Sequence, residues 1–247
     1  MKNTWGQACL HFIFPSLCPL CREVVDHEST LCATCWPKIE FIAPPYCDQC
    51  GLPLETASLH EKEKCLSCLH HSFSFIENRS AILYTHTSKK MILDLKHGHK
   101  LSIAPLLAAW AAHRGKAVIQ KSDLLVPVPL HWTRLLKRGF NQAAVLTQHI
   151  GKRTNKSYLL NTLKRIKKTP SQEGLTAHAR QKNMQHAFVV DKPEKIKGKS
   201  ILLIDDVMTT GATLDASAKV LIQSGAKCVR TLTIGRVRPH IKHESNI

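Results

Sequence analysis

Four C-x-x-C pairs near the start of the chain constrain its fold more than any other feature. The eight cysteines are Cys18, Cys21, Cys32, Cys35, Cys47, Cys50, Cys65 and Cys68. Two sulfurs three positions apart on a tight turn can reach one ion at about 2.3 Å, and two such turns complete a tetrahedral site of four cysteines. The spacing therefore predicts a small module organised by structural zinc, with one ion or two.

The sequence alone does not decide which two C-x-x-C pairs would bind the same ion. Sequential pairing is the simplest arrangement, with the sulfurs of residues 18–35 around one ion and those of residues 47–68 around another. Interleaved pairing is the alternative. A disulfide framework competes with zinc, but such frameworks are typical of secreted proteins. We expect structural or surface roles, and no zinc ligation, for the other cysteines and the nearby histidines, which are Cys9, Cys228, His60, His70 and His71.

Basic side chains are concentrated in the second part of the chain. The formal net charge is +17; residues 1–72 hold 5 Lys and Arg against 8 Asp and Glu, whereas residues 73–247 hold 30 against 10. So large an excess favours a polyanionic partner or a phosphate-rich ligand. Because the cysteine module is acidic, we expect any nucleic acid to contact residues 73–247. The densest basic run, our nucleic-acid candidate, is Lys164, Arg165, Lys167 and Lys168, for which an ordinary solvated loop is the alternative.

The chain lacks the apolar segments of a membrane protein. No apolar run approaches the about 20 residues that span a bilayer. The weakly apolar residues 1–18 contain His11 and Pro15 and no small-residue cleavage site, so we do not expect a signal peptide. We therefore expect a cytoplasmic protein without a transmembrane segment.

Strand and helix patterns alternate after the cysteine module. We expect strands at 79–86, 123–130, 199–206 and 228–236, helices at 88–98, 101–115, 141–151 and 211–225, and a helix leading into a strand at 175–190. Such alternation predicts an α/β fold with a mostly parallel sheet. We place the boundary between two domains near residues 70–78, giving a zinc module at 1–72 and an α/β domain at 73–247.

Two adjacent aspartates follow the clearest buried strand. Residues 201–204 read Ile-Leu-Leu-Ile, and Asp205 and Asp206 come next. Ligands of a parallel sheet bind at the carboxyl ends of its strands. There the two carboxylates can accept hydrogen bonds from a ribose diol, while the loop and helix start at residues 209–213 can hold a phosphate. One short segment therefore offers partners for both parts of a ribose 5-phosphate.

Two common nucleotide-binding motifs are absent from the sequence. It has neither the G-x-x-x-x-G-K of a P-loop nor the G-x-G-x-x-G of a dinucleotide-binding fold. Nucleotide hydrolysis and dinucleotide redox chemistry therefore lose support.

Residues 201–213 resemble the 5-phosphoribosyl 1-pyrophosphate (PRPP) signature of type I phosphoribosyltransferases. The likeness continues through residues 127–143, which read PVPLHWTRLLKRGFNQA, and residues 167–188. With the four cysteine pairs, these segments are similar to the ComF/ComFC family, which includes the GntX-like proteins. The resemblance covers nearly the whole chain. It implies a type I phosphoribosyltransferase-like sheet, mostly parallel and flanked by helices, behind a small N-terminal double zinc ribbon.

The resemblance also implies roles for individual residues. Asp205 and Asp206 would bind the ribose hydroxyls and, with Arg138, form the catalytic set. The PRPP site would continue through Val207 and Met208 into a 5′-phosphate loop of Thr209, Thr210, Gly211, Ala212 and Thr213. The pyrophosphate would lie against Pro129, Leu130 and His131. Arg134, Lys137 and Arg138 would lie near it or in a mobile loop closing over it. Mg²⁺ would bridge pyrophosphate and ribose oxygens.

An aromatic platform for a nucleobase is not evident near the C-terminal end. After Tyr158 the chain has one aromatic residue, Phe188. We expect a base-binding wall, if there is one, to come from residues 73–100 or from the zinc module.

Three functions compete at this level. The one we favour, from the resemblance, is a PRPP-binding protein of DNA uptake in natural transformation, or of DNA utilisation, that binds single-stranded DNA and works with other uptake proteins. The candidates for stacking on bases are Trp132, Phe140 and Tyr158. The alternatives are a salvage phosphoribosyltransferase that transfers ribose 5-phosphate to a nucleobase, and a non-catalytic PRPP-sensing regulator.

Overall fold

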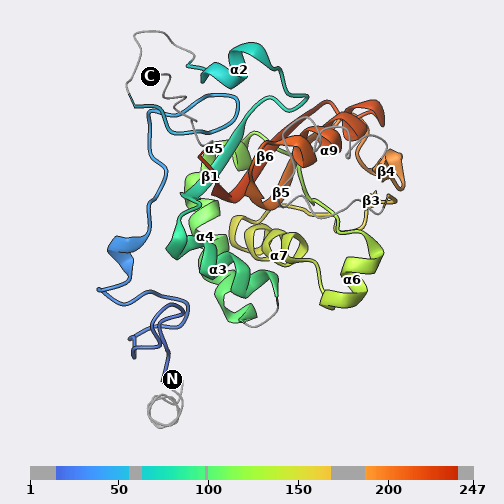
Figure 1. The fold of residues 1–247 in the computed structure, drawn as a ribbon. Helices are drawn as coiled ribbons and strands as arrows, with labels where there is room; N and C mark the ends of the chain where they lie inside the picture. The colour runs from blue at the N-terminus through green and yellow to red at the C-terminus, as the bar shows by residue number, and fades with distance from the viewer. Residues whose placement is uncertain (1–14, 56–62, 98–99, 168–186, 239–247) are drawn as a thin grey trace, which may run out of the picture.

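The computed structural model describes residues 15–55, 63–97, 100–167 and 187–238 (Figure 1). Within these ranges, no helix has both the length and the apolar character needed to cross a bilayer.

A four-stranded parallel sheet forms the centre of the molecule. Its strands are β1 (Asn78–Leu83), β2 (Leu124–Pro127), β5 (Ser200–Met208) and β6 (Cys228–Arg236), in the order β1-β6-β5-β2. All three neighbouring pairs are parallel. The strands are rich in Leu, Ile and Val because helices cover both faces of a parallel sheet. The predicted fold class is confirmed.

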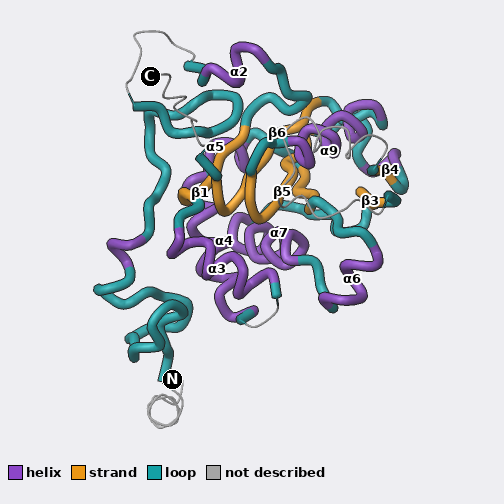
Figure 2. Tube along the Cα trace, in the orientation of Figure 1, coloured by secondary structure: helices purple, strands orange, loops and turns teal. Residues whose placement is uncertain are grey.

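Helices cover the two faces of this sheet (Figures 1 and 2). One face carries α3 (His86–Lys96), α4 (Ala104–Arg114), α5 (Lys116–Gln120) and α7 (Gln142–Thr154), and the other carries α9 (Ala212–Gln223). Alternate residues of β5 point to opposite faces, so Leu202 and Ile204 join the core under α4 and α7 while Ile201 and Leu203 join the core under α9.

Shorter elements complete the described fold. They are the hairpin of β3 (Leu163–Arg165) and β4 (Phe188–Val190), the helices α2 (Leu66–His70) and α6 (Trp132–Arg138), and the 3-10 turns η1 (Trp36–Lys38), η2 (Leu101–Ile103) and η3 (Pro193–Lys195). The predicted strand at the end of residues 175–190 is therefore present as β4, and the helix expected before it lies outside the described residues.

Residues 132–138 form the helix α6, where a mobile loop closing over the ligand was one of two expectations. His131 precedes the helix and caps it, since its Nδ1 accepts a hydrogen bond from the amide of Thr133, and Gly139 follows the helix with a φ of +80°. A capping side chain followed by a left-handed glycine delimits a helix at both ends. These residues therefore do not form an irregular loop, and the other alternative, a place near the pyrophosphate, stays a prediction.

Both edges of the sheet are paired with irregular segments. Beside β1, the amide of Ile42 donates to the carbonyl of Ala81, and that of Leu83 donates to the carbonyl of Glu40. Beside β2, the amide of Leu125 donates to the carbonyl of Ser157. The edge strands therefore do not present open ladders for pairing with another chain.

The eight paired cysteines gather into two sets of four. The N-terminal cysteine cluster is Cys18, Cys21, Cys32 and Cys35, and the second cysteine cluster is Cys47, Cys50, Cys65 and Cys68; the sulfurs of each lie within 4.8 Å of one another. Sequential pairing is confirmed, and interleaved pairing is wrong. Four thiolates this close fit one tetrahedral zinc ion per cluster.

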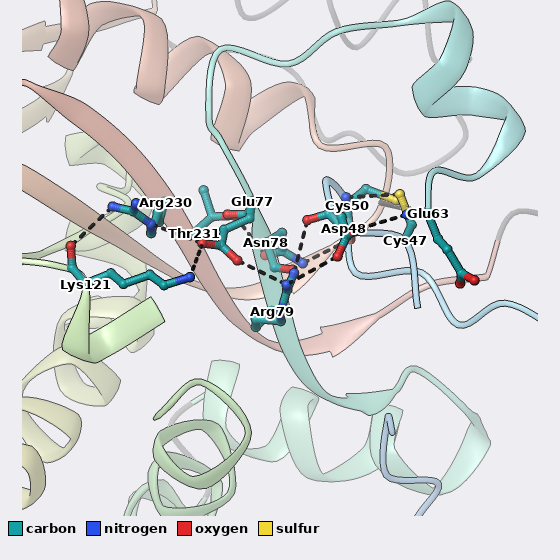
Figure 3. Close-up of polar contacts among 10 residues, drawn as sticks. All are labelled: Cys47, Asp48, Cys50, Glu63, Glu77, Asn78, Arg79, Lys121, Arg230 and Thr231. Carbon is teal, nitrogen blue, oxygen red and sulfur yellow. Dashed lines mark hydrogen bonds and ion pairs between the residues drawn. The ribbon is translucent and has the colours of Figure 1, made fainter. Parts of the chain in front are cut away.

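The two clusters have different surroundings. The N-terminal cluster lies beside α3 and η2, where Lys100 Nζ donates to the carbonyl of Pro19 at 2.8 Å. The second cluster lies against β1, where Asn78 Nδ2 donates to the carbonyl of Cys50 and Arg79 Nη1 donates to that of Asp48, both at 3.1 Å (Figure 3). The second cluster is thus part of the core over the sheet. The proposed division at residues 72 and 73 stays a prediction.

The other cysteines and histidines lie outside the two clusters or outside the described residues. Cys228 accepts a hydrogen bond from Arg230 Nη1, and the ring of His71 packs edge-on against Phe73 at 5.0 Å. His70 is an exposed residue at the end of α2. Cys9 and His60 lie outside the described residues.

Candidate functional site

A cavity of about 590 Å³ opens at the carboxyl ends of β2 and β5. The end of β5, the loop before α9, the turn after β2, α6, the start of α7 and one face of α3 all line it. This is the position at which ligands bind in open parallel sheets.

Asp205 and Asp206 stand at the floor of this cavity, near the end of β5. Asp205 Oδ1 accepts the amide hydrogen of Asp206, and Asp206 Oδ1 accepts that of Val207, both at 2.8 Å. Burial and the neighbouring Asp206 raise the pKa of Asp205 well above its usual value, while Lys96 partly offsets the rise. Two carboxylates in such a place gain from any ligand that brings hydroxyl donors or a cation.

Gln142 connects Asp206 to the basic side of the cavity. Its Nε2 donates to Asp206 Oδ2 at 3.1 Å, and its Oε1 accepts from Arg138 Nη1 at 2.7 Å. Asn141 caps α7 and ties it to β2, because its Nδ2 donates to the carbonyl of Val128. The amide of Gln142 is therefore held between a carboxylate and a guanidinium.

Three arginines line the cavity: Arg134, Arg138 and Arg165. Burial and the charge of Arg134 lower the pKa of Arg165 to about 10, against an opposing effect of Asp205. Burial also lowers the pKa of Arg138, with Arg134 adding to the shift and Asp206 opposing it. Like charges held together in a partly buried wall produce a positive potential that attracts an anion.

The loop before α9 combines a left-handed glycine with a helix N-terminus. Gly211 has a φ of +85°, and α9 begins at the next residue. A Cβ added at Gly211 would lie 2.8 Å from the Phe73 ring and from Met208 Cε. Amide groups at the start of a helix point outward and carry partial positive charge, so this loop can hold a phosphate.

Most of the residues predicted for the PRPP site line the cavity. They are Pro129, Leu130, Arg134, Arg138, Asp205, Asp206, Val207, Met208, Thr209, Gly211, Ala212 and Thr213. His131 is buried and caps α6, Lys137 is exposed on α6, and Thr210 accepts a hydrogen bond from the amide of Ala212. These three are not part of the cavity wall, and the ligand roles of all fifteen stay predictions.

The basic run 164–168 divides between surface and cavity. Arg165 is buried and faces the cavity, while Lys164 on the same strand is exposed and forms an ion pair with Asp191 at 2.7 Å. Lys167 is exposed, and Lys168 lies outside the described residues. Arg165 therefore lies where it can meet a ligand of the cavity, which the sequence run did not suggest.

The sequence analysis missed one wall of the cavity. It comes from the end of β1 and from α3, and it contains Tyr84, Lys89, Ile92, Leu93, Lys96 and His97. These residues fall within 73–100, one of the two segments from which we expected a base-binding wall, and their contact with a base stays a prediction. Gln142 was also missed, although it stands in the first turn of the predicted helix at 141–151.

Comparison with known proteins adds two domain matches. A double zinc ribbon domain matches residues 9–69, and a phosphoribosyl transferase domain matches residues 135–245.

Several curated relatives match along most of their length. The chain is 30% identical over 229 residues to the DNA utilization protein YhgH of Salmonella typhimurium, covering 90% of this chain and 97% of the relative. It is 31% identical over 244 residues to competence protein F of Haemophilus influenzae, covering 96% and 100%. It is 28% identical over 213 residues to competence protein ComFC of Bacillus subtilis, covering 85% of each.

Proposed function

Since this chain belongs to the ComF family, which includes competence protein F, ComFC and YhgH, we propose that it binds PRPP with Mg²⁺ and acts in the uptake or use of DNA. The observation that carries the PRPP assignment is the pair Asp205–Asp206 leading directly into the glycine loop and the N-terminus of α9. Relatives named for competence and DNA utilization support the biological role.

The cavity offers a partner for each part of PRPP. The carboxylates of Asp205 and Asp206 accept hydrogen bonds from the two ribose hydroxyls. The amides and hydroxyls of residues 209–213 surround the 5′-phosphate. Arg134, Arg138 and Arg165 face the pyrophosphate, whose charge relieves their mutual repulsion. An arrangement with acceptors at one point and donors at two others matches a sugar that carries two anionic groups.

The donor set of the cavity also suits Mg²⁺. This ion binds through one or two carboxylates together with substrate phosphates and waters. Asp205 and Asp206 would help to hold it, and when bound it neutralises charge on the pyrophosphate. The two cysteine clusters would each hold a structural zinc ion.

The same residues can assist displacement at the anomeric carbon. As the bond to pyrophosphate lengthens, positive charge develops on the ribose ring and negative charge on the leaving group. The carboxylates of Asp205 and Asp206 stabilise the ring, and Arg138 stabilises the pyrophosphate. Gln142 fixes Asp206 and Arg138 relative to each other, so both charges are oriented before the ligand arrives.

A transferase reaction with an acceptor is the second candidate function. The observation in its favour is the wall from β1 and α3, where Tyr84 and His97 line the cavity beyond the aspartates. An aromatic and an imidazole side chain can contact a planar acceptor. Release of pyrophosphate from PRPP with one member of a nucleobase panel supports transfer, and tight PRPP binding without release with any member favours a sensor.

We place single-stranded DNA on the surface around α6 and β3. Backbone pairing of His131 with Arg165 brings these elements together. Trp132, which follows His131, is 61% exposed, and Lys164 and Lys167 on either side of Arg165 in the chain are also exposed. An exposed indole beside lysines provides a base-stacking platform and phosphate contacts. Of the other stacking candidates, Tyr158 packs against the core beside Gly151, and Phe140 is partly buried.

Calorimetric titration with Mg²⁺-PRPP tests the proposal. The double variant Asp205→Asn/Asp206→Asn should lose the saturable binding of the wild type. Asp123→Asn is the matched control, because Asp123 Oδ2 also accepts a backbone amide, that of Ser200, but at the opposite end of β5. Equal binding by the wild type and the double variant, or no binding by folded, zinc-loaded wild type, contradicts the PRPP assignment.

A further inference from the structure

One buried arginine joins the second cysteine cluster to the phosphate loop. Arg236 is the last residue of β6 and is 5% exposed. On the cluster side, its Nε donates to the carbonyl of Cys50 at 3.2 Å, and its Nη2 donates to Cys50 Sγ at 3.5 Å. The contact to sulfur is charge-assisted when Cys50 is a zinc-bound thiolate.

The other nitrogen of the same guanidinium reaches the loop that precedes α9. Arg236 Nη1 donates to the carbonyl of Thr209 at 2.7 Å and lies 3.2 Å from that of Met208. It also donates to the carbonyl of Val237 at 2.8 Å. Because the planar fork of an arginine is rigid, its two sides cannot move independently. A shift of Cys50 is therefore transmitted to Thr209.

A second contact runs between the same two parts of the molecule. The segment that follows α2 places Phe73 against Gly211, and the Phe73 ring is stacked on Phe75 at 4.7 Å. The amide of Ser74 donates to Asp215 Oδ1 at 2.6 Å, which fixes this segment to the first turn of α9. The loop is thus held from two directions by chain that extends from the second cluster.

We propose that the second cysteine cluster, when it holds zinc, fixes the phosphate loop in its binding conformation, with Arg236 as the positioning residue between them. Four thiolates on one Zn²⁺ leave a net negative charge, and Arg236 offsets it while its remaining donors orient the loop. Hydrogen bonds around the ligands of a metal site commonly set the position of what surrounds it. The identity of the anion in the loop rests on the proposed function, whereas the coupling itself does not.

The N-terminal cysteine cluster is differently placed. Its described side-chain hydrogen bonds to the rest of the fold lie on the side of α3 and η2: Lys90 and Lys100 donate to the carbonyls of Leu20 and Pro19, and Ser29 Oγ donates to the carbonyl of Ser102. Zinc in this cluster should therefore not affect the phosphate loop. The chain therefore contains an internal control: of its two similar clusters, only the second has described contacts to the phosphate loop.

Hydrogen exchange of the loop amides tests the coupling without any ligand. In Arg236→Gln, peptides covering residues 203–214 should exchange roughly tenfold faster or more, the effect of losing a charge-assisted hydrogen bond. Arg230→Gln is the matched control, because Arg230 also lies on β6 and contacts a cysteine sulfur, that of Cys228, but at the amino end of the sheet. The substitution also removes the ion pair of Arg230 with Glu77 (Figure 3). The loop should exchange normally in this control.

Removal of zinc provides the reciprocal measurement. Cys35→Ser removes one ligand of the N-terminal cluster and should leave the second loaded, and Cys65→Ser should do the reverse. Loop exchange should accelerate only in Cys65→Ser. Because coupling between two sites is reciprocal, Mg²⁺-PRPP should slow the transfer of zinc to a chelator from Cys35→Ser, and this protection should be lost when Arg236→Gln is added.

The outcomes separate the two proposals. Unchanged loop exchange in Arg236→Gln, or equal acceleration in Arg230→Gln, overturns the coupling. Accelerated exchange in Arg236→Gln together with no PRPP binding by the wild type supports the coupling and overturns the proposed ligand. If Arg236→Gln does not fold, two milder variants replace it: Arg236→Lys perturbs the arginine connection, and Phe73→Leu perturbs the contact with Gly211. Normal loop exchange in both variants overturns the coupling.

Discussion

Gln142, at the start of α7, donates from Nε2 to Asp206 Oδ2 at the end of β5, over 3.1 Å. Its other amide atom accepts from Arg138 at 2.7 Å. A neutral side chain therefore holds a carboxylate and a guanidinium apart while bonding to both. Without it, Arg138 and Asp206 could close on each other and occupy the sites that a ligand needs.

Replacing Gln142 by leucine should weaken PRPP binding. The change removes the donor to Asp206 and the acceptor for Arg138, and a hydrogen bond to a charged group contributes about 1.5–3 kcal/mol. We expect a dissociation constant roughly 10- to 100-fold higher by calorimetry. Gln148→Leu, on the same helix but outside the cavity wall, should bind as the wild type does. Similar losses in both variants would point to damage of α7 as a whole.

Asp205→Asn should abolish PRPP binding and yet stabilise the free protein at neutral pH. Burial and Asp206 raise the pKa of Asp205 in the folded state, so the folded protein binds the proton more tightly than the unfolded chain. Stability contributed by this group is then lost as pH rises from about 4, the unfolded pKa, through the raised folded pKa. The asparagine has no charge to bury and can still accept from the amide of Asp206.

The measurement is thermal unfolding of wild type and Asp205→Asn from pH 4 to pH 8. At pH 8 the melting temperature of the variant should exceed that of the wild type, by about 2–4 °C for each kcal/mol that burial of the Asp205 charge costs. The difference should shrink toward pH 4. A variant that is less stable at pH 8 would show that Asp205 contributes more through its contacts than burial of its charge costs.

Gly211→Ala should disrupt the phosphate loop more than an equivalent change elsewhere. Both Gly211 and Gly139 have a positive φ, so alanine costs about 1–2 kcal/mol of backbone strain at either position. At Gly211 the new methyl group also meets Phe73 and Met208 at 2.8 Å, whereas at Gly139 nothing lies within 4 Å. Urea unfolding should show a larger loss for Gly211→Ala, and PRPP binding should fall only in that variant. Equal losses would contradict the close approach of Phe73.

The two cysteine clusters should contribute unequally to stability. The second cluster is part of the hydrophobic core that includes β5 and α9. The N-terminal cluster forms a small core of its own, which meets the main core only through the partly buried Leu20 and Leu31 among the described residues. Cys65→Ser should therefore lower the midpoint of the main thermal transition. Cys35→Ser should change that midpoint little, because we expect it to alter the free energy of unfolding in that transition by no more than about 0.5 kcal/mol. Zinc content, measured alongside, should fall by one ion in each variant.

Lys164→Gln/Lys167→Gln should weaken single-stranded DNA binding and its dependence on salt. Each phosphate contact to a single strand contributes about 0.7 to the slope of log affinity against log salt, so two lost contacts reduce the slope by about 1.4. Fluorescence anisotropy with a labelled oligonucleotide measures both quantities. Lys199→Gln/Lys227→Gln makes the same change of charge at the amino end of the sheet, and equal effects there would argue for nonspecific attraction.

The main architecture could be predicted because its signals are local. The run of apolar residues before Asp205 predicts a buried strand, and a parallel sheet then places the next side chains at the ligand-binding edge. The cysteine spacing likewise predicts the module. The spacing does not decide between sequential and interleaved pairing, because in both arrangements two short turns can bring four sulfurs to one ion.

The missed features depend on contacts between distant segments. Arg165 reads as one member of a basic run, yet β3 turns it inward and Lys164 outward, and a strand of three residues is too short to recognise by periodicity. Arg236 likewise reads as a basic residue at a strand end. Its role emerges only when Cys50 and Thr209, far apart in the sequence, are seen on either side of it.

The first strand of the sheet in chain order pairs with the last strand. β1 pairs with β6, which comes much later in the chain. Arg236, at the end of β6, donates a hydrogen bond to the carbonyl of Cys50. During synthesis, the second cysteine cluster and β1 therefore leave the ribosome long before β6 and Arg236. The cluster can bind metal early, but the sheet cannot be completed until β6 emerges. A chain shortened before β6 would leave β1 without its pairing strand and Cys50 without Arg236.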